Sequence, residues 1–537
     1  MKKYKIVIVG GGTAGWFAAA WLSKFRKGSI TLIENPNIPK IGVGESVTPH
    51  VQRFFDLLEV DTKDWMKNTS AIYKYANKFV NWSDHDPEYF GFSYTSNTKE
   101  FTDPTFDLMR MLERETTRTT DVFLELYRQQ HLDKFDRYFN DNYNYMEKNT
   151  MPFINGEYQC NPFYSWSQHI NADLASEYVK ETIAIPNGVT HIQANVKDLV
   201  TTGDIVNYLI LDNGTKIEAD IVIDCTGFGG AVVNKLNFEK IQYPDNFIDS
   251  AWVCQLNYAD HESEMVNYTQ SIAQDYGWLF KIGLYHRMGS GYCFSSQHIS
   301  KDDALKAYHG MVDNLRGTPR LLTWKPGRLK EAAKGNVISV GLSSGFVEPL
   351  EANALFIITS SIVHLNTVLE QYEQTDNLDF TNFNNDIAYL IDDIADFIRV
   401  HYSLSNRRDT QFWKDCASTR DVEQELQLVR DKYYNEKGSI VNSAQYKTLF
   451  PNYMWLQLAL AWKLDVSTWP AHPTDTLLTD GLSFFKQKYD THHAKAASCL
   501  NTYRWLKENI YGVESNQWES NIVKTPPFNS SLDTKTK

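Results

Sequence analysis

Two short, continuously apolar runs near the N-terminus flank a stretch with helical character. Residues 5–9 (KIVIV) and 29–33 (SITLI) are rich in β-branched side chains, which is typical of strands buried on both faces. Residues 16–22 (WFAAAWL) lie between them, after a glycine-rich turn, and form an apolar helix pattern. The pattern predicts a β-α-β unit of about thirty residues.

Further buried strands are predicted only after long intervals, at residues 219–224 and 336–340. Between them, residues 240–325 alternate apolar and polar positions, as the strands of an antiparallel sheet do. A long helix pattern begins near residue 353, and the chain stays mainly helical to about residue 520. The sequence therefore predicts an α/β fold with a Rossmann-like module and a second, mixed-sheet and helical module.

Composition limits the classes of partner. The 537 residues carry 53 basic and 66 acidic side chains, a net charge of −13, which argues against nucleic acid or an anionic membrane. No apolar run reaches the roughly 18–20 residues of a membrane span, and no secretory leader pattern is visible, so a cytoplasmic protein is expected. The six cysteines form no CxxC pair and the histidines lack ligand spacing, so no metal site is expected. The composition leaves open whether the chain forms a homo-oligomer.

The turn after the first strand has the spacing of a dinucleotide-binding site. Its three glycines, in a Gly-x-Gly-x-x-Gly pattern, permit the tight turn, the approach of a pyrophosphate and the packing of the helix on the strand. An acid 19 residues beyond the last glycine ends the second strand, where it can hold a ribose hydroxyl. The alternative is an ordinary glycine-rich turn. The cofactor-binding residues predicted from this unit are Gly10, Gly12, Thr13, Ala14, Gly15 and Glu34.

The discontinuous arrangement of strands favours FAD over a nicotinamide cofactor. No second Gly-x-Gly-x-x-Gly is present, so reducing equivalents are expected from transient NAD(P)H or from flavin that a partner has reduced. The expected organisation is a hydroxylase-type FAD-binding module in three parts (1–82, 161–240 and 326–370), an insertion near the substrate site (83–160), an antiparallel sheet region (241–325), a helical substrate-side module (371–524) and a polar tail (525–537).

Several blocks of the sequence resemble the flavin-dependent tryptophan halogenase family. The GFVEPLE and HYSLSNRRDTQFW blocks are the most specific to this family, whereas the first glycine-rich block is common to many flavoproteins. Together the blocks extend in order over most of the chain. They are GGGTAGW (10–16), KIGVGESVTPH (40–50), YKYANKFVNW (73–82), DCTGFGG (224–230), GWLFKIGL (277–284), GLSSGFVEPLEANAL (341–355) and FIRVHYSLSNRRDTQFW (397–413).

The resemblance implies a two-component halogenase. FADH2 from a flavin reductase reacts with oxygen, a halide is oxidised to hypohalous acid, and this acid travels to a lysine beside a small aromatic, indole-like substrate. Lys78 matches that lysine and Glu351 matches the glutamate beside the substrate, so the two side chains are expected to meet. The alternatives are a surface lysine and a helix N-terminal acid. The further cofactor-binding residues implied are Gly42, Val43, Gly44, Glu45, Gly341 and Leu342.

Two departures from the family pattern bear on specificity. The family's GWxWxIP block reads GWLFKIG here, which keeps Trp278, replaces the second Trp by Phe280 and loses the proline. After the glutamate, Asn353 and Ala354 stand at the expected halide-binding backbone amides, and we expect bromide or iodide to be used better than chloride.

The aromatic residues allow two interpretations. Trp278, Phe280 and Trp455 are candidates for the substrate pocket, with core packing as the alternative. His401 is expected to fix the helical module against the flavin module. At the level of function, a flavin-dependent aromatic monooxygenase (hydroxylase) and a flavin-binding protein without halogenating activity remain the alternatives.

Overall fold

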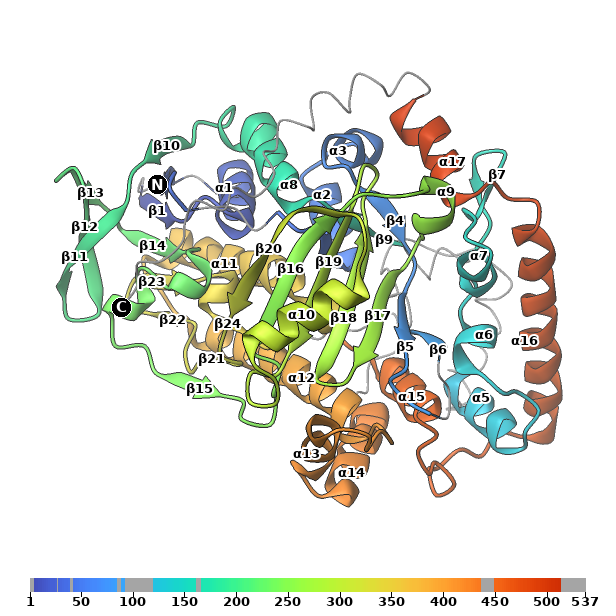
Figure 1. The fold of residues 1–537 in the computed structure, drawn as a ribbon. Helices are drawn as coiled ribbons and strands as arrows, with labels where there is room; N and C mark the ends of the chain where they lie inside the picture. The colour runs from blue at the N-terminus through green and yellow to red at the C-terminus, as the bar shows by residue number, and fades with distance from the viewer. Residues whose placement is uncertain are drawn as a thin grey trace.

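The computed structural model describes residues 4–26, 28–38, 42–84, 88–91, 119–160, 166–435 and 449–512. One six-stranded sheet, at the left of Figure 1, joins strands from distant parts of the chain, and all its strands are parallel except the last. The α/β prediction is thereby confirmed. In sheet order the strands are β10 (Thr190–Gln193), β2 (Ser29–Glu34), β1 (Lys5–Val9), β14 (Ile221–Asp224), β23 (Val337–Ser339) and β22 (Ala333–Lys334).

Both faces of this sheet are covered, which explains the unbroken apolar run of β1. Ile6 and Ile8 pack in the same core as Trp16 and Phe17 of helix α1 (Thr13–Phe25). The intervening residues Val7 and Val9 belong to a second core, on the side of a small three-stranded sheet. A strand with polar residues on one face would leave buried polar groups there. The small sheet consists of β11 (Val196–Thr202), β12 (Ile205–Leu211) and β13 (Lys216–Glu218).

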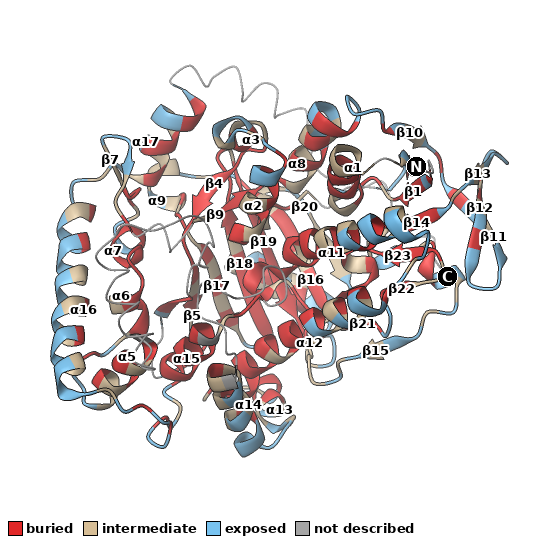
Figure 2. Cartoon of the chain, turned by 180° about the vertical axis from the view of Figure 1, so that it is seen from behind, coloured by how far each residue is buried: buried red, intermediate tan, exposed pale blue. Residues whose placement is uncertain are grey.

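A second, seven-stranded sheet crosses the middle of the molecule (Figure 1), and its central strands β18 and β19 are almost wholly buried (Figure 2). Neighbouring strands of this sheet are antiparallel, except that β17 and β5 pair in parallel. The expected organisation placed residues 77–80 in the first part of the FAD-binding module (1–82), but they pair with β17 and extend this second sheet. In sheet order the strands are β20 (Leu315–Thr323), β16 (Ser250–Leu256), β19 (Met288–Phe294), β18 (Gly277–Gly283), β17 (Thr269–Gln274), β5 (Asn77–Val80) and β6 (Glu88–Gly91).

Helix α11 (Asn353–Thr375) is the long helix expected after the last strand of the first sheet. It contacts α1 on one side and α12 (Thr381–Ser403) on the other. Within the described residues, the segment 350–375 is the one helix apolar and long enough to cross a membrane, but 72% of its most apolar window is buried inside the protein. Its apolar character is therefore explained by core packing.

Helices dominate the C-terminal third, as expected. Helix α16 stands at the edge of the molecule beside α5–α7 and exposes its outer face (Figures 1 and 2). Helix α5 lies within the expected insertion (83–160), while residues 92–118 and the polar tail lie outside the described residues. The remaining helices are α5 (Thr119–Arg128), α6 (Phe135–Phe139), α7 (Tyr143–Glu147), α8 (Ala172–Val179), α13 (Gln411–Ser418), α14 (Val422–Asn435), α15 (Asn452–Ala461), α16 (Asp475–Ala496) and α17 (Thr502–Leu506).

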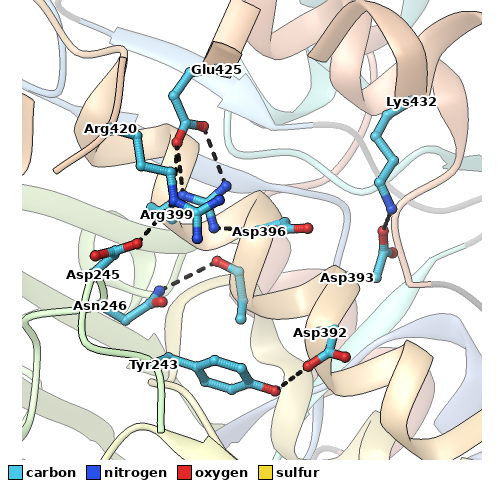
Figure 3. Close-up of polar contacts among 11 residues, drawn as sticks. Tyr243, Asp245, Asn246, Asp392, Asp393, Asp396, Arg399, Arg420, Glu425 and Lys432 are labelled. Carbon is cyan, nitrogen blue, oxygen red and sulfur yellow. Dashed lines mark hydrogen bonds and ion pairs between the residues drawn. The ribbon is translucent and has the colours of Figure 1, made fainter. Parts of the chain in front are cut away.

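A network of charged side chains fixes α12 against α14 (Figure 3). The guanidinium of Arg399 binds Glu425 at 2.9 Å, and both side chains are almost fully buried. Because an unpaired buried charge is costly, neither helix can shift without separating this pair. The position of α12 matters because its C-terminal turn carries His401. Further contacts in the network join Arg399 to Asp396, Lys432 to Asp393, Arg420 to Asp245, Tyr243 to Asp392, and Asn246 to the carbonyl of Ala395.

Candidate active site

The glycine-rich turn opens into a cavity of about 430 Å³ at the carboxyl ends of the parallel strands. This edge is where open α/β sheets bind their ligands. Gly15 and Gly341, which were also predicted to bind the cofactor, are not among the residues that line this cavity. The other residues predicted to bind the cofactor line the cavity: Gly10, Gly12, Thr13, Ala14, Glu34, Gly42, Val43, Gly44, Glu45 and Leu342.

The three glycines of the turn serve different purposes. A Cβ atom on Gly10 would lie 2.4 Å from the carbonyl oxygen of Cys225, and one on Gly15 would lie 1.8 Å from the carbonyl oxygen of Gly10. These two positions therefore permit close backbone packing. A Cβ on Gly12 would meet nothing within 4 Å, so this glycine keeps the cavity open at the N-terminus of α1. Glu34, at the cavity edge, lies 2.9 Å from the ring of His191. The turn thus suits a dinucleotide such as FAD.

A second, smaller pocket of about 120 Å³ adjoins the cofactor cavity. Its walls are largely apolar and include Trp278 and Phe280, two of the predicted pocket residues, together with Trp324 and Phe346. The two spaces lie side by side, because the same residues line both. The shared residues are Val43, Gly44, Glu45, Phe228, Leu342 and Ala354.

Glu351 lies in this second pocket and is 4% exposed. Asn77 of β5 donates a hydrogen bond of 2.5 Å to its Oε2, and Nε2 of His401 lies 3.5 Å from its Oε1. Glu351 and Ala352 both have left-handed backbone angles, with φ of 65° and 59°. Such angles cost of order 1–3 kcal/mol each for residues other than glycine and tend to cluster at functional sites. Here they turn the chain so that residues 351–354 all line the pocket.

The predicted halide position is the first turn of α11, at Asn353 and Ala354, and both residues line the same pocket. N–H groups in a first helical turn have no acceptor within the helix, and the helix dipole favours an anion there. The side-chain amide of Asn353 is already engaged, because its Nδ2 donates to the carbonyls of Glu348 and Leu350 at 2.7 and 2.8 Å. An anion at this position would therefore be held by backbone groups.

The prediction that Lys78 meets Glu351 is wrong. Lys78 follows Asn77 on β5, and successive side chains of a strand point to opposite faces. Because Asn77 faces Glu351, Lys78 points away from it. The Lys78 ammonium instead pairs with Glu88 at 2.8 Å and lies over the ring of Phe90.

Another lysine of the same sequence block, Lys74, lies near Glu351. It ends strand β4 (Ile72–Lys74), is 2% exposed, and its Nζ lies 3.4 Å from the carbonyl oxygen of Val47. Burial lowers the pKa of Lys74 to about 7, although the charge of Glu351 acts in the opposite direction. The sequence carried a signal for this residue, because Lys74 interrupts the apolar run AIYKYA and a lysine in such a run is expected to be buried.

Trp455 belongs to the core, which corrects its assignment to the substrate pocket. It is fully buried, packs edge-on against Phe397 at 4.8 Å and donates to the carbonyl of Phe450. It lines neither of the two spaces described above. Trp462 donates to the carbonyl of His401 at 3.1 Å and so supports the residue that contacts Glu351. The sequence assigned His401 a structural role and did not indicate this contact.

We expect Gly12→Ala to weaken FAD binding by at least about tenfold without changing the melting temperature. The added methyl group would project into open cavity space, where the backbone must approach the pyrophosphate. Titration of oxidised FAD by fluorescence, beside thermal unfolding, checks this. Gly310→Ala is the matched control, since a Cβ there also meets nothing within 4 Å but lies far from the turn on a surface helix. Unchanged FAD affinity in Gly12→Ala would contradict this position of the pyrophosphate.

Comparison with known proteins agrees with the geometry. The profile of the tryptophan halogenase family matches residues 5–473. The chain is 32% identical over 433 residues to tryptophan 7-halogenase RebH of Lentzea aerocolonigenes, covering 76% of this chain and 78% of that protein. It is 30% identical over 422 residues to tryptophan 6-halogenase ThaL of Streptomyces albogriseolus, with the same coverage.

Solved structures give the same result. Xcc4156, a flavin-dependent halogenase from Xanthomonas campestris, superposes with a TM-score of 0.79 and 27% identity, covering 94% of this chain and 98% of that one. VirX1 superposes with a TM-score of 0.74 and 28% identity, covering 95% of this chain and 100% of that one. The family profile, the relatives and the solved structures agree, and the chain belongs to the tryptophan halogenase family of flavin-dependent halogenases.

Proposed function

We propose that this protein halogenates an electron-rich, indole-like aromatic with hypohalous acid, and that Lys74 and Glu351 act on the oxidant and the substrate. The observation that carries the proposal is the pocket that shares a wall with the cofactor cavity and contains Glu351, close to the buried Lys74. FAD, supplied in its reduced form by a separate flavin reductase, provides the two electrons that let oxygen oxidise the halide. The balance is X⁻ + O2 + FADH2 + H⁺ → HOX + FAD + H2O, followed by ArH + HOX → ArX + H2O.

The first turn of α11 holds the halide in this proposal. The backbone N–H groups of Asn353 and Ala354 provide donors beside the cofactor cavity, because Ala354 lines both spaces. The hypohalous acid then passes along the aromatic wall that includes Trp278 and Phe280.

At the far end, the Lys74 ammonium donates a hydrogen bond to the oxygen of the hypohalous acid and makes the halogen more electrophilic. The carboxylate of Glu351 stabilises the cation that forms on the aromatic ring and accepts the ring proton. Asn77 and His401 hold the carboxylate in one orientation, as preorganised electrostatic catalysis requires. These roles replace the expectation for Lys78.

Replacing each of the two lysines by methionine, in separate variants, tests this assignment. We expect Lys74→Met to lower halogenated product by about 10²–10⁴-fold, the range that a positioned acid contributes, while FAD affinity is kept. Lys78→Met, the matched control, should retain activity within about threefold, because it loses only a partly exposed pair with Glu88. Product is measured by mass spectrometry with FAD, a flavin reductase and an indole. The reverse order of effects would contradict the assignment. Product formed without halide would indicate a hydroxylase, and FAD binding without any halogenated product would indicate a flavin-binding protein.

The pH dependence of coupling reports which form of Lys74 acts. Its pKa of about 7 means that the ammonium predominates below pH 7 and the amine above it. If the ammonium polarises the oxidant, product per FADH2 oxidised should be constant below pH 7 and fall about tenfold per unit well above it. The rate of FADH2 oxidation, recorded in the same samples, is the control and should lack this limb. A rise in coupling above pH 7 would instead assign the reaction to the free amine as carrier of the halogen.

We further propose that bromide and iodide are used better than chloride. Larger halides are oxidised more easily and cost less to desolvate on entering a pocket with aromatic walls. Equal concentrations of chloride and bromide with one indole substrate should therefore give mainly the brominated product, as measured by mass spectrometry. Free hypohalous acids reacting with the same indole provide the reference ratio. A clear preference for chloride would overturn this proposal.

A further inference from the structure

Three polar side chains form a buried hydrogen-bonded chain beside Lys74. Ser46 ends strand β3 (Glu45–Ser46), and its Oγ lies 2.8 Å from the hydroxyl of Thr269 on β17. The Thr269 hydroxyl lies 2.8 Å from Nε2 of His169, whose Nδ1 lies 3.0 Å from the carbonyl oxygen of Gly283. His169 belongs to β9 (Ser167–Ile170), the strand that lies between β3 and β4. Ser46 and His169 thus belong to the same small sheet that carries Lys74, and Thr269 joins them from the seven-stranded sheet.

The direction of every hydrogen bond in this chain follows from its end. A carbonyl oxygen only accepts, so Nδ1 of His169 must carry the hydrogen that Gly283 receives. Burial, and then the charge of Lys74, lower the pKa of His169 to about 3, so the ring is neutral and Nε2 has a free lone pair. Nε2 therefore accepts from Thr269. Since this uses the single hydrogen of the Thr269 hydroxyl, Ser46 must donate to Thr269.

The consequence is that Ser46 presents only lone pairs to the pocket that it lines. Asn353 and Ala354, which line the same pocket, present backbone N–H donors. These two parts of the lining therefore differ in hydrogen-bond polarity. A halide anion is stabilised by donors and gains nothing from an acceptor. A neutral hypohalous acid carries an O–H group, and that group can donate to Ser46.

We propose that Ser46 Oγ is a binding station for neutral hypohalous acid in the pocket of Glu351, oriented by Thr269 and His169. The inference rests on the proposed function and adds a residue to it. Val47, whose carbonyl contacts the Lys74 ammonium, directly follows Ser46, so the two groups approach the same oxidant. The O–H of the acid donates to Ser46, its oxygen accepts from Lys74, and the halogen is left pointing away from both. No bond to the protein forms or breaks.

The experiment measures where the oxidant goes. Each variant receives FAD, a flavin reductase, bromide and an indole, with a bulk thioether that traps escaped hypobromous acid. In Ser46→Ala the ratio of trapped oxidant to brominated indole should rise roughly fivefold, the factor that one hydrogen bond supplies. FAD affinity and the rate of FADH2 oxidation should not change, which a general loss of structure would not allow.

Further variants test whether the effect comes from the hydrogen bonds of Ser46, Thr269 and His169 or from any change in the pocket lining. Thr269→Val should raise the ratio as Ser46→Ala does, and Thr269→Ser should restore it. Ser271→Ala is the control, because Ser271 is also buried and lines the same pocket but is outside the chain. An unchanged ratio in Ser46→Ala, or an equal rise in Ser271→Ala, would overturn the inference.

The direction of the hydrogen bonds from Ser46 to His169 can be measured without cofactor or turnover, from the tautomer of His169. In flavin-free protein with ¹⁵N-labelled histidine, His169 should give the signals of the neutral ring protonated at Nδ1, assigned by comparison with His169→Gln. The opposite tautomer would overturn the inference. If the wild-type protein forms no halogenated product with any halide, the proposed function fails and this inference with it. If the wild type halogenates but Ser46→Ala partitions as the wild type does, this inference alone fails.

Discussion

The site depends on placing a carboxylate and an amine together away from water. Glu351 and Lys74 are 4% and 2% exposed, and either charge alone would be costly at that depth. Burial removes the water that would solvate these charges, and neighbouring elements supply polar partners for Glu351 in its place. β5 brings Asn77, α12 brings His401, and the left-handed turn at Glu351 directs its carboxylate toward both. The network that fixes α12 to α14 therefore also fixes a partner of the carboxylate (Figure 3).

The segment 42–46 links the two spaces, because it lines the cofactor cavity on one side and the pocket of Glu351 on the other. The segment is held by Arg287, which is only 2% exposed. Its guanidinium donates to the carbonyls of Val43 and Gly42 at 2.6 and 2.9 Å. Gln255 donates to the same Gly42 carbonyl. A buried guanidinium holds two carbonyls with a geometry that a lysine could not reproduce. The wall between the spaces is therefore tied to the second sheet by Gln255 of β16 and by Arg287, which directly precedes β19.

The sequence was informative where function depends on local geometry. The glycine turn could be predicted because its Gly-x-Gly-x-x-Gly spacing lies within one β-α unit, although the close contact at Gly10 is with Cys225, far along the chain. The choice between Lys74 and Lys78 depended on strand pairing, since β5 joins β17 almost two hundred positions later in the chain. Trp455 was misplaced for a similar reason. Spacing along a helix shows which residues share a face, but it does not show which element covers that face.

The glycine at position 283 illustrates how a departure from a family pattern acquires a physical meaning. In the sequence, a glycine in place of proline suggests a less rigid backbone at the end of the GWLFKIG block. In the structure a Cβ at Gly283 would lie 3.0 Å from the hydroxyl of Tyr258 and 3.2 Å from Ile72, so the site is tightly packed. Its carbonyl accepts from His169 and so sets the direction of the chain that ends at Ser46. The missing side chain lets β18 approach the small sheet that carries Lys74. This contact joins β18, which lines the pocket of Glu351, to the strand of the lysine.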